Sequence, residues 1–258
     1  MKSFSRLVYP YLIWALLMIV IPVLFIIFYA FSVQGNDIIN IKFTIDNFVR
    51  FFEDPMFLEV LINSLKIAVI TTIICILVGY PFAYGLTKLK ANSQAIIVLL
   101  VTFPMWINIL VRTYAWRGLL LESPFSPEAK VYIGIVYNFL PFMILQIYTA
   151  LSKLDPNLDV AAHDLGCDNR NAFLRVTLPL SMPGVISGIT LVFLPAVSSF
   201  FIPKLLGGGS FVLIGNLIES YFLGAGDWNF GAAISTIMTI VILISMYITR
   251  KLDYSEED

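Results

Sequence analysis

Charged residues are scarce in this chain of 258 residues: Lys, Arg, Asp and Glu together make up 13% of it, whereas apolar residues make up 59%. A soluble domain has about 25% charged and about 45–50% apolar residues. This imbalance excludes an ordinary soluble domain. The formal net charge of −1 gives no electrostatic basis for binding nucleic acid.

Histidine and cysteine are almost absent, which leaves little material for metal or redox chemistry. His163 has no second His or Cys at ligand spacing, so we expect no metal site. Cys75 and Cys167 are expected to remain thiols. No G-x-x-x-x-G-K-[ST], G-x-S-x-G or H-E-x-x-H motif occurs. We therefore expect that the chain is not an enzyme and binds no cofactor itself.

Long apolar stretches are what the chain has instead. Each of six uncharged runs reaches the roughly 20 residues that cross the hydrocarbon core of a bilayer. Backbone groups in lipid must be satisfied within the segment, which favours helices. We predict an all-α integral membrane protein in which residues 1–258 form a single transmembrane domain. The predicted spans are 7–31, 67–87, 91–111, 131–152, 176–203 and 229–249.

Two apolar segments need separate treatment. The first run follows Lys2 and Arg6, but it is far longer than the apolar part of a signal peptide, about 7–15 residues, and no small-x-small cleavage site follows it. We expect a retained helix. The run 205–218 is too short to span a membrane, and we expect it to be re-entrant or interfacial.

The distribution of Lys and Arg predicts the orientation. With both termini on the cytoplasmic side, the inner segments hold nine basic residues and the outer loops hold six. Short cytoplasmic flanks carry such an excess in membrane proteins. The inverted orientation is the less favoured alternative. The predicted orientation puts the loop between the fourth and fifth spans in the cytoplasm.

That loop carries the most informative pattern of the chain. From residue 160 to residue 188 it contains A-A-x-x-x-G, followed by L-P and P-G. Asp155 and Pro156 suit the start of a helix that runs to about residue 165, and Gly166 suits a left-handed end. A second short helix is expected over 171–177, broken by Pro179 and by P-G at 183–184. An ordinary connecting loop is the alternative, although loops of this length are usually functional.

These residues resemble the transmembrane permease subunits of ABC importers, in particular the spermidine/putrescine (PotB-like) branch. The loop over about 155–184 fits the family pattern E-A-A-x-x-x-G, except that Val160 stands at the Glu position, with Asp159 one residue earlier. Branch-specific stretches occur in the same order as in the family: F-I-P-K-L-L-G-G-G from residue 201, I-G-N-L-I from 214 and D-W-N-F-G-A-A from 227.

The resemblance implies a MetI-like fold of six transmembrane helices with a cytoplasmic coupling helix, working by alternating access. It implies two ATPase subunits that use ATP and Mg²⁺, a second, PotC-like permease subunit forming a heterodimer, and an extracytoplasmic polyamine-binding protein. The expected location is the cytoplasmic membrane of a prokaryote. The residues expected to couple to the ATPase are Asp159, Ala161, Ala162, Asp164, Leu165, Gly166, Phe173, Leu178 and Pro179.

Aromatic and acidic residues in the outer segments are candidates for contact with substrate. A polyamine is a polycation, which carboxylates and aromatic faces bind through ion pairing and cation–π contacts. Interfacial aromatic belts and solvated acids are the alternative interpretation. No acid lies within the six runs, so selectivity is expected to lie mainly in the binding protein. The candidates are Trp106, Asn108, Tyr114, Trp116, Glu122, Glu219, Tyr221 and Asp227.

Other transport functions fit the sequence less well. A secondary transporter would usually show an intramembrane ionisable group or an inverted repeat, and a channel would need a selectivity filter. Within the ABC class, iron, thiamine and phosphonate are alternative substrates, because related permeases share the loop.

Overall fold

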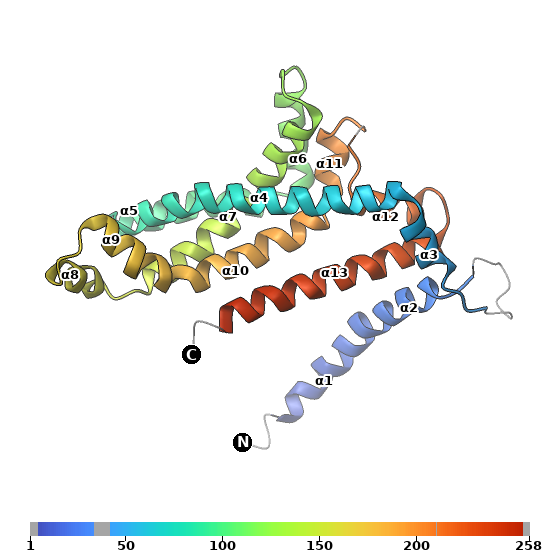
Figure 1. Ribbon diagram of the computed structural model, residues 1–258, viewed down its shortest axis with the longest axis horizontal. Helices are drawn as coiled ribbons and strands as arrows, with labels where there is room; N and C mark the ends of the chain where they lie inside the picture. The colour runs from blue at the N-terminus through green and yellow to red at the C-terminus, as the bar shows by residue number, and fades with distance from the viewer. Residues whose placement is uncertain (1–4, 34–41, 210, 255–258) are drawn as a thin grey trace. The chain divides into compact units, whose positions relative to one another are not determined.

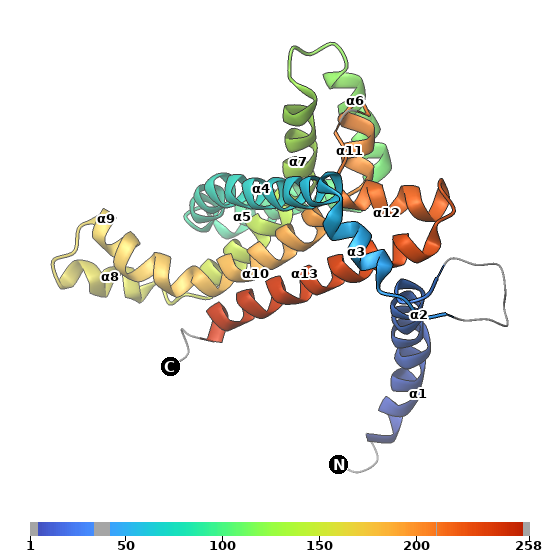
Figure 2. The same ribbon diagram turned by 45° about the vertical axis from the view of Figure 1, so that its right-hand side comes forward.

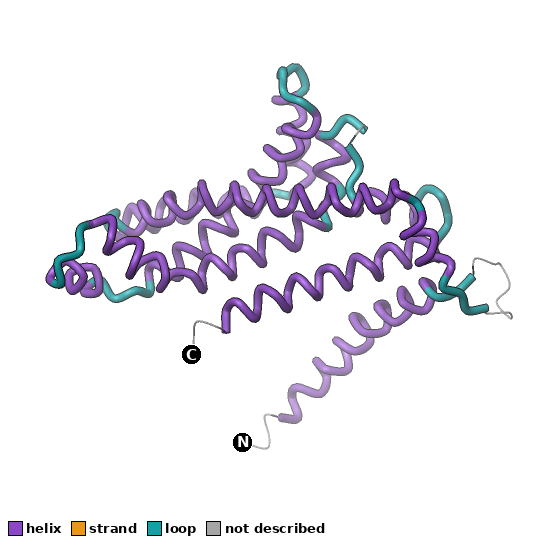
Figure 3. The backbone as a smooth tube through the Cα atoms, viewed as in Figure 1, coloured by secondary structure: helices purple, strands orange, loops and turns teal. Residues whose placement is uncertain are grey.

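The computed structural model describes residues 5–33, 42–209 and 211–254. Figure 3 shows helices joined by short loops, and within these residues the only β-pairing is an isolated bridge between Ser32 and Phe43. In the part of the chain that the structure describes, five helices are long and apolar enough to cross a membrane, and a bent pair makes a sixth if it counts as one span. The chain packs as two compact units, Met1–Val60 with Leu217–Leu243 and Leu61–Asn216 with Ile244–Asp258. The sequence does not predict this division.

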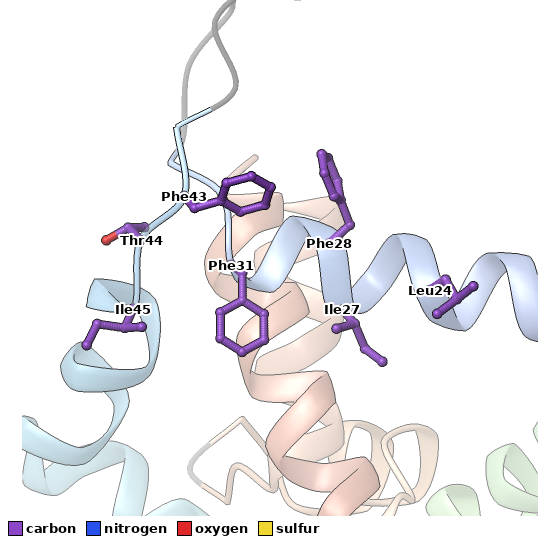
Figure 4. Close-up of a pocket in the computed structure, with 7 residues that line it drawn as sticks. All are labelled: Leu24, Ile27, Phe28, Phe31, Phe43, Thr44 and Ile45. Carbon is purple, nitrogen blue, oxygen red and sulfur yellow. The ribbon is translucent and has the colours of Figure 1, made fainter.

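The first unit begins with a helix whose apolar surface is not covered by the chain. It comprises α1 (Ser5–Ala15), a π-helical turn η1 (Leu16–Val20) and α2 (Ile21–Ala30). None of its apolar window is buried. At its end an open apolar groove lies between α2 and the segment that follows residue 42 (Figure 4). The rest of the first unit therefore does not cover this surface.

Two amide side chains close the end of that helix. The Nδ2 of Asn47 donates to the carbonyl oxygens of Ala30 and Ser32 at 2.9 and 3.1 Å. The Nδ2 of Asn229 donates to the carbonyl oxygens of Tyr29 and Ser32 at 3.1 and 3.0 Å. The last carbonyl groups of a helix have no partner within it, so these bonds satisfy the end of α2.

Aromatic residues form the core of the first unit. They come from α3 (Asp46–Glu53), the start of α4 (Pro55–Thr87), the part of α12 (Ile214–Leu223) from residue 217, and α13 (Trp228–Tyr254) up to residue 243. The Phe57 ring lies 5.9 Å from the Phe51 ring and 5.0 Å from the Phe230 ring. All three side chains are buried.

The second unit is built on α7 (Pro127–Ser152) and α10 (Leu178–Val197), which pack along each other beside α4 (Figures 1 and 2). Small residues permit the close approach, because a Cβ atom on Gly184 or Gly188 would overlap Ala150 or Met143. The short helix α11 (Phe201–Leu206) lies against α7 and against α6 (Ile109–Leu120), and Figure 2 shows the three helices side by side.

The third predicted span differs from its prediction. Instead of one helix over 91–111, α5 (Ala91–Thr102) and a 3₁₀ turn η2 (Phe103–Trp106) end before residue 107, and α6 leaves at 94°. Asn108 explains the break, because its Oδ1 accepts a hydrogen bond from the Leu110 amide at 2.8 Å and starts a new helix. Pro104 contributes by removing a backbone donor.

The fifth predicted span differs in the opposite way, because its helix continues through residues that were expected to interrupt it. The sequence predicts a helix end at Pro179 and Pro183, but the helix continues from Asn169 to Val197. Pro179 lies in the first turn of α10, where the missing N–H costs little. A π-helical turn η3 (Phe173–Thr177) precedes it. The run 205–218 is divided, because α11 ends at residue 206 and α12 begins at residue 214.

Candidate coupling site

The helix α8 (Asn157–Asp164) starts where the sequence predicts. The Oδ1 of Asp155 accepts a hydrogen bond from the Asn157 amide at 2.9 Å, and its carbonyl oxygen accepts one from the Leu158 amide at 3.0 Å. Pro156 stands between them and has no N–H to satisfy. The residues D-P-N therefore fix the first turn locally.

The end of α8 is a glycine turn. The Cys167 amide donates to the Ala162 carbonyl at 3.0 Å and the Gly166 amide to the His163 carbonyl at 2.9 Å, which is the Schellman pattern. Gly166 has a φ of +87°, in the left-handed region that favours glycine. The Nδ1 of His163 lies 2.8 Å from the Cys167 carbonyl oxygen and closes the turn. The predicted turn at Gly166 is confirmed, and His163 gains a structural role.

A second helix returns from the turn toward the long helices. Asp168 caps α9 (Asn169–Ala172) by accepting a hydrogen bond from the Asn171 amide at 2.9 Å. From there the backbone runs through η3 into α10 without interruption. Figure 1 shows α8 and α9 as an angled pair beyond the ends of α4 and α10. α9 is therefore continuous with a candidate membrane-spanning helix, and α8 joins α9 through the turn at Gly166.

An aromatic contact anchors the return helix. The Phe173 ring lies 5.7 Å from the Tyr80 ring and 5.1 Å from the Tyr84 ring, both in edge-on geometry. Such pairs contribute about 0.5–1.5 kcal/mol beyond their buried area. The Tyr80 hydroxyl and Ser181 Oγ are hydrogen-bonded at 2.7 Å and join α4 to α10.

An ion pair anchors α8 itself. The Nζ of Lys88 lies 3.1 Å from the Oδ2 of Asp159 and 5.1 Å from the centre of the Tyr84 ring. Desolvation lowers the pKa of Lys88, but the hydrogen bond and charge of Asp159, together with Tyr84, raise it by more, so the pKa lies above its usual value. Asp159, beside the position of the family glutamate, is thus engaged by its own chain.

The predicted coupling residues divide into two groups. Ala162 is buried, and Phe173 and Leu178 are half-buried against the second unit. The other members are exposed, and Leu165 is the most exposed of them at 86%. Val160 is also exposed. The remaining exposed members are Ala161, Asp164, Gly166 and Pro179.

The predicted substrate residues of the second unit do not form one cluster of contacts. Asn108 caps α6, and the Trp116 ring packs edge-on against the Tyr137 ring at 5.2 Å. Both therefore have structural partners. The other three side chains are exposed and are Trp106, Tyr114 and Glu122.

In the first unit, two predicted residues meet a third that the sequence does not single out. The Nη1 of Arg50 lies 2.9 Å from the Oδ2 of Asp227. Its guanidinium lies 4.0 Å from the centre of the Phe230 ring and 5.8 Å from that of Tyr221. The other carboxylate oxygen of Asp227 accepts a hydrogen bond from the Phe230 amide at 3.1 Å. Glu219 is half-buried on α12. The carboxylate and ring expected to receive a substrate cation already hold one from the chain.

Comparison with known proteins identifies the family of the chain. Residues 1–253 match the family described as the binding-protein-dependent transport system inner membrane component. The chain belongs to this family. The permease is 39% identical over 250 residues to the spermidine/putrescine transport system permease protein PotB of Escherichia coli (strain K12), covering 89% of this chain and 90% of that protein. It is therefore a multi-pass transport subunit of the inner membrane.

Solved structures agree on the fold. The permease matches a chain of a bacterial ABC transporter involved in the import of the acidic polysaccharide alginate with a TM-score of 0.71 and 13% identity, covering 97% of this chain and 96% of that one. It matches a chain of the inward-facing MetNI methionine ABC transporter with a TM-score of 0.62 and 14% identity, covering 79% and 98%. The all-α, MetI-like fold expected from the sequence is confirmed.

Proposed function

We propose that the permease moves polyamines, the substrates named for its PotB relatives. The identity to PotB over nearly the whole chain carries this proposal. A polyamine is a flexible polycation, and aromatic faces and carboxylates suit it. Because no Asp or Glu lies within the six apolar runs of the sequence, selectivity rests mainly with a separate binding protein.

Coupling to an ATPase runs through α8. Val160 on α8 and Leu165 at its end are exposed apolar side chains, and we assign both to the docking surface. The Asp159 ion pair holds α8, and Phe173 holds the helix that follows. Closure of the ATPase pair would therefore displace α8, α9 and α10 together and drive alternating access.

The working assembly has several other parts. It comprises two ATPase subunits, which use ATP and Mg²⁺, a second, PotC-like permease that forms a heterodimer with this chain, and an extracytoplasmic polyamine-binding protein. The permease itself binds no cofactor. The uncovered apolar surface of residues 9–30 supports contact with lipid or the second permease. Both termini and α8 lie on the cytoplasmic side of a prokaryotic membrane, as the basic residues indicate.

The predicted pathway residues differ in how available they are to the passing substrate. Asp227 and Tyr221 hold Arg50, so they contact a polyamine only if Arg50 leaves. Asn108 and Trp116 act mainly through their structural contacts. The remaining pathway candidates are Trp106, Tyr114, Glu122 and Glu219.

The test is ATP-dependent uptake of radiolabelled spermidine into proteoliposomes that contain the complete importer. Gly166→Val is compared with Gly166→Asn. A Cβ atom at Gly166 would meet no atom within 4 Å, so the two variants differ mainly in backbone preference. Valine is strained at positive φ, whereas asparagine tolerates it. Uptake should collapse in the valine variant and persist in the asparagine variant.

Each component of the proposal is contradicted by a different result. Assembly with ATPase activity but without spermidine uptake would discard the substrate. An ATPase that does not co-purify with the permease would discard α8 as its docking site. Equal uptake by the two Gly166 variants would discard the turn as part of coupling.

A further inference from the structure

Arg112 on α6 carries a charge that its own chain does not pair. Its Nε and Nη1 atoms are buried, and within residues 5–33, 42–209 and 211–254 they have no hydrogen-bond partner. No carboxylate among these residues forms an ion pair with Arg112. A buried guanidinium without a partner is strongly unfavourable. An anionic group from outside the chain would remove this cost.

Arg112 stands at the edge of an exposed apolar face of α6. Four exposed residues at helical spacing form this face, which we call the stripe: Val111, Ala115, Gly118 and Leu119. Arg112 and Leu119 are seven residues apart, nearly two helical turns, and so lie on the same side of α6. Arg112 as a whole is only half-buried, so a group that lies on the stripe can reach it.

The other side of α6 is covered by the chain itself. Thr113 and Leu120 are buried, and the Trp116 ring packs on the Tyr137 ring of α7. The helix α11 also lies against α6 (Figure 2). Within the described part of the chain, the stripe is therefore the side of α6 that has no packing partner.

Small residues in the stripe fit a close contact with another helix. Gly118 lies inside α6 and does not have a positive φ. A Cβ atom added there would meet no packing neighbour within 4 Å among the described residues. Glycine weakens a helix interior relative to alanine, so nothing within this part of the chain accounts for it. In membrane proteins, glycine and alanine at helix interfaces let two helices approach closely, and Ala115 lies one turn before Gly118.

We propose that the stripe binds a membrane helix of the second permease and that a carboxylate on this helix pairs with Arg112, an inference that rests on the proposed function. The helix α6 belongs to a candidate membrane span, so the partner of its exposed face also lies in the membrane. A carboxylate matches the planar guanidinium, which donates two parallel hydrogen bonds. Ionisable groups within a membrane pair with one another in this way.

Other occupants match only one of the two features. A phospholipid brings a phosphate to Arg112, but its acyl chains do not require a glycine at position 118. A polyamine has the same sign of charge as Arg112 and is repelled. A second copy of this chain would bring the same unpaired cation to the contact. A carboxylate-bearing helix of another membrane subunit satisfies both the charge and the close approach.

The first experiment measures how tightly the second permease is held. The tagged permease is purified in detergent with its ATPase and the second permease, and the fraction of second permease retained is followed on dilution. Arg112→Gln should weaken this association by about thirtyfold, as expected when a buried charge pair loses one partner. Arg117→Gln removes an exposed charge from the same helix and should change it by less than about twofold. Equal retention by the two variants would overturn the inference.

Unfolding of the isolated permease in detergent separates this contact from a role within the chain. Arg112→Gln should leave the denaturant midpoint unchanged or raise it, because the guanidinium has no partner there. Gly118→Ala should raise the midpoint, since alanine favours a helix, and yet weaken the association with the second permease by about tenfold through overpacking. A lower midpoint for Arg112→Gln would mean that the chain itself already pairs this group, and the inference would be wrong.

Lipid analysis and uptake distinguish the remaining outcomes. If Arg112→Gln lost bound anionic phospholipid but kept the second permease, the occupant would be a lipid and the inference would be rejected. Spermidine uptake by the wild-type importer is measured in parallel. Its absence would discard polyamine import, whereas loss of the second permease from Arg112→Gln would still support the contact at the stripe.

Discussion

Two sites in the permease hold a cation of the chain against a carboxylate and an aromatic ring, and they differ in how exposed the carboxylate is. The first, the clasp, consists of Arg50, Asp227, Tyr221 and Phe230. Its carboxylate is 16% exposed and one of its rings is fully buried. The second, the joint, consists of Lys88, Asp159 and Tyr84. Its carboxylate is 40% exposed, and it borders a cavity.

The two sites also differ in the cation that they hold. The guanidinium of Arg50 is planar, stacks at 4.0 Å over a ring and pairs with Asp227 at the same time. Such geometry suits a fixed contact. The ammonium of Lys88 is a flexible point charge, 5.1 Å from its ring. The two sites therefore contain the same classes of residue but differ in the burial of the carboxylate and in the type of cation.

Removal of the buried ring is the strongest way to break the clasp. Phe230→Ala should lower the free energy of unfolding by about 3–5 kcal/mol, because it empties a buried site that packs against Phe57 and Tyr221. Phe52→Ala, at a ring that is 58% exposed, is the matched control and should change it by less than about 1 kcal/mol. Denaturant unfolding of the purified permease in detergent measures both. Similar losses would mean that the clasp is not the core of its unit.

The carboxylate of the clasp has two roles that substitution can separate. Asp227→Ala removes the partner of Arg50 and the cap on the Phe230 amide, and should cost about 2 kcal/mol. Asp227→Asn keeps the cap and should cost about half as much. The difference between the two melting curves gives the contribution of the cap. An asparagine variant as unstable as the alanine variant would show that the cap contributes nothing.

Local chemistry is what makes the joint partly predictable from sequence. The apolar runs give five spans that fall largely within observed helices, and D-P-N with Gly166 gives both ends of α8. These features depend on neighbouring residues alone. Tyr84 and Lys88 are visible in the sequence, but only the fold brings them to Asp159.

The clasp could not be predicted in the same way. Arg50 and Asp227 are separated by 177 positions, and no pattern near either residue indicates the other. The two failed helix boundaries have a different cause. Pro179 predicts a helix break, but a proline is tolerated in the first turn of a helix. Asn108 does not interrupt the apolar run that predicts the third span, and yet it caps the start of a new helix.

Double-mutant cycles compare the two ion pairs directly. Arg50→Met with Asp227→Asn should give a coupling energy of about 1–2 kcal/mol, since its carboxylate is largely buried. Lys88→Met with Asp159→Asn should give about 0.5 kcal/mol or less. Unfolding of the four proteins in each cycle provides the values. Equal coupling energies would remove the distinction between clasp and joint.

The smallest expected difference between the clasp and the joint is in how their coupling energies respond to salt. At about 1 M ionic strength the Debye length is about 3 Å, shorter than at physiological salt. The coupling energy of the joint should then fall close to zero, because both of its side chains are more than one-third exposed. The clasp should keep most of its coupling energy, since the protein shields Asp227 from solvent. Repeating both cycles at low and high salt measures this. A clasp that lost its coupling as fast as the joint would have to be an open surface pair, and Asp227 and Tyr221 would then be available to a passing polyamine.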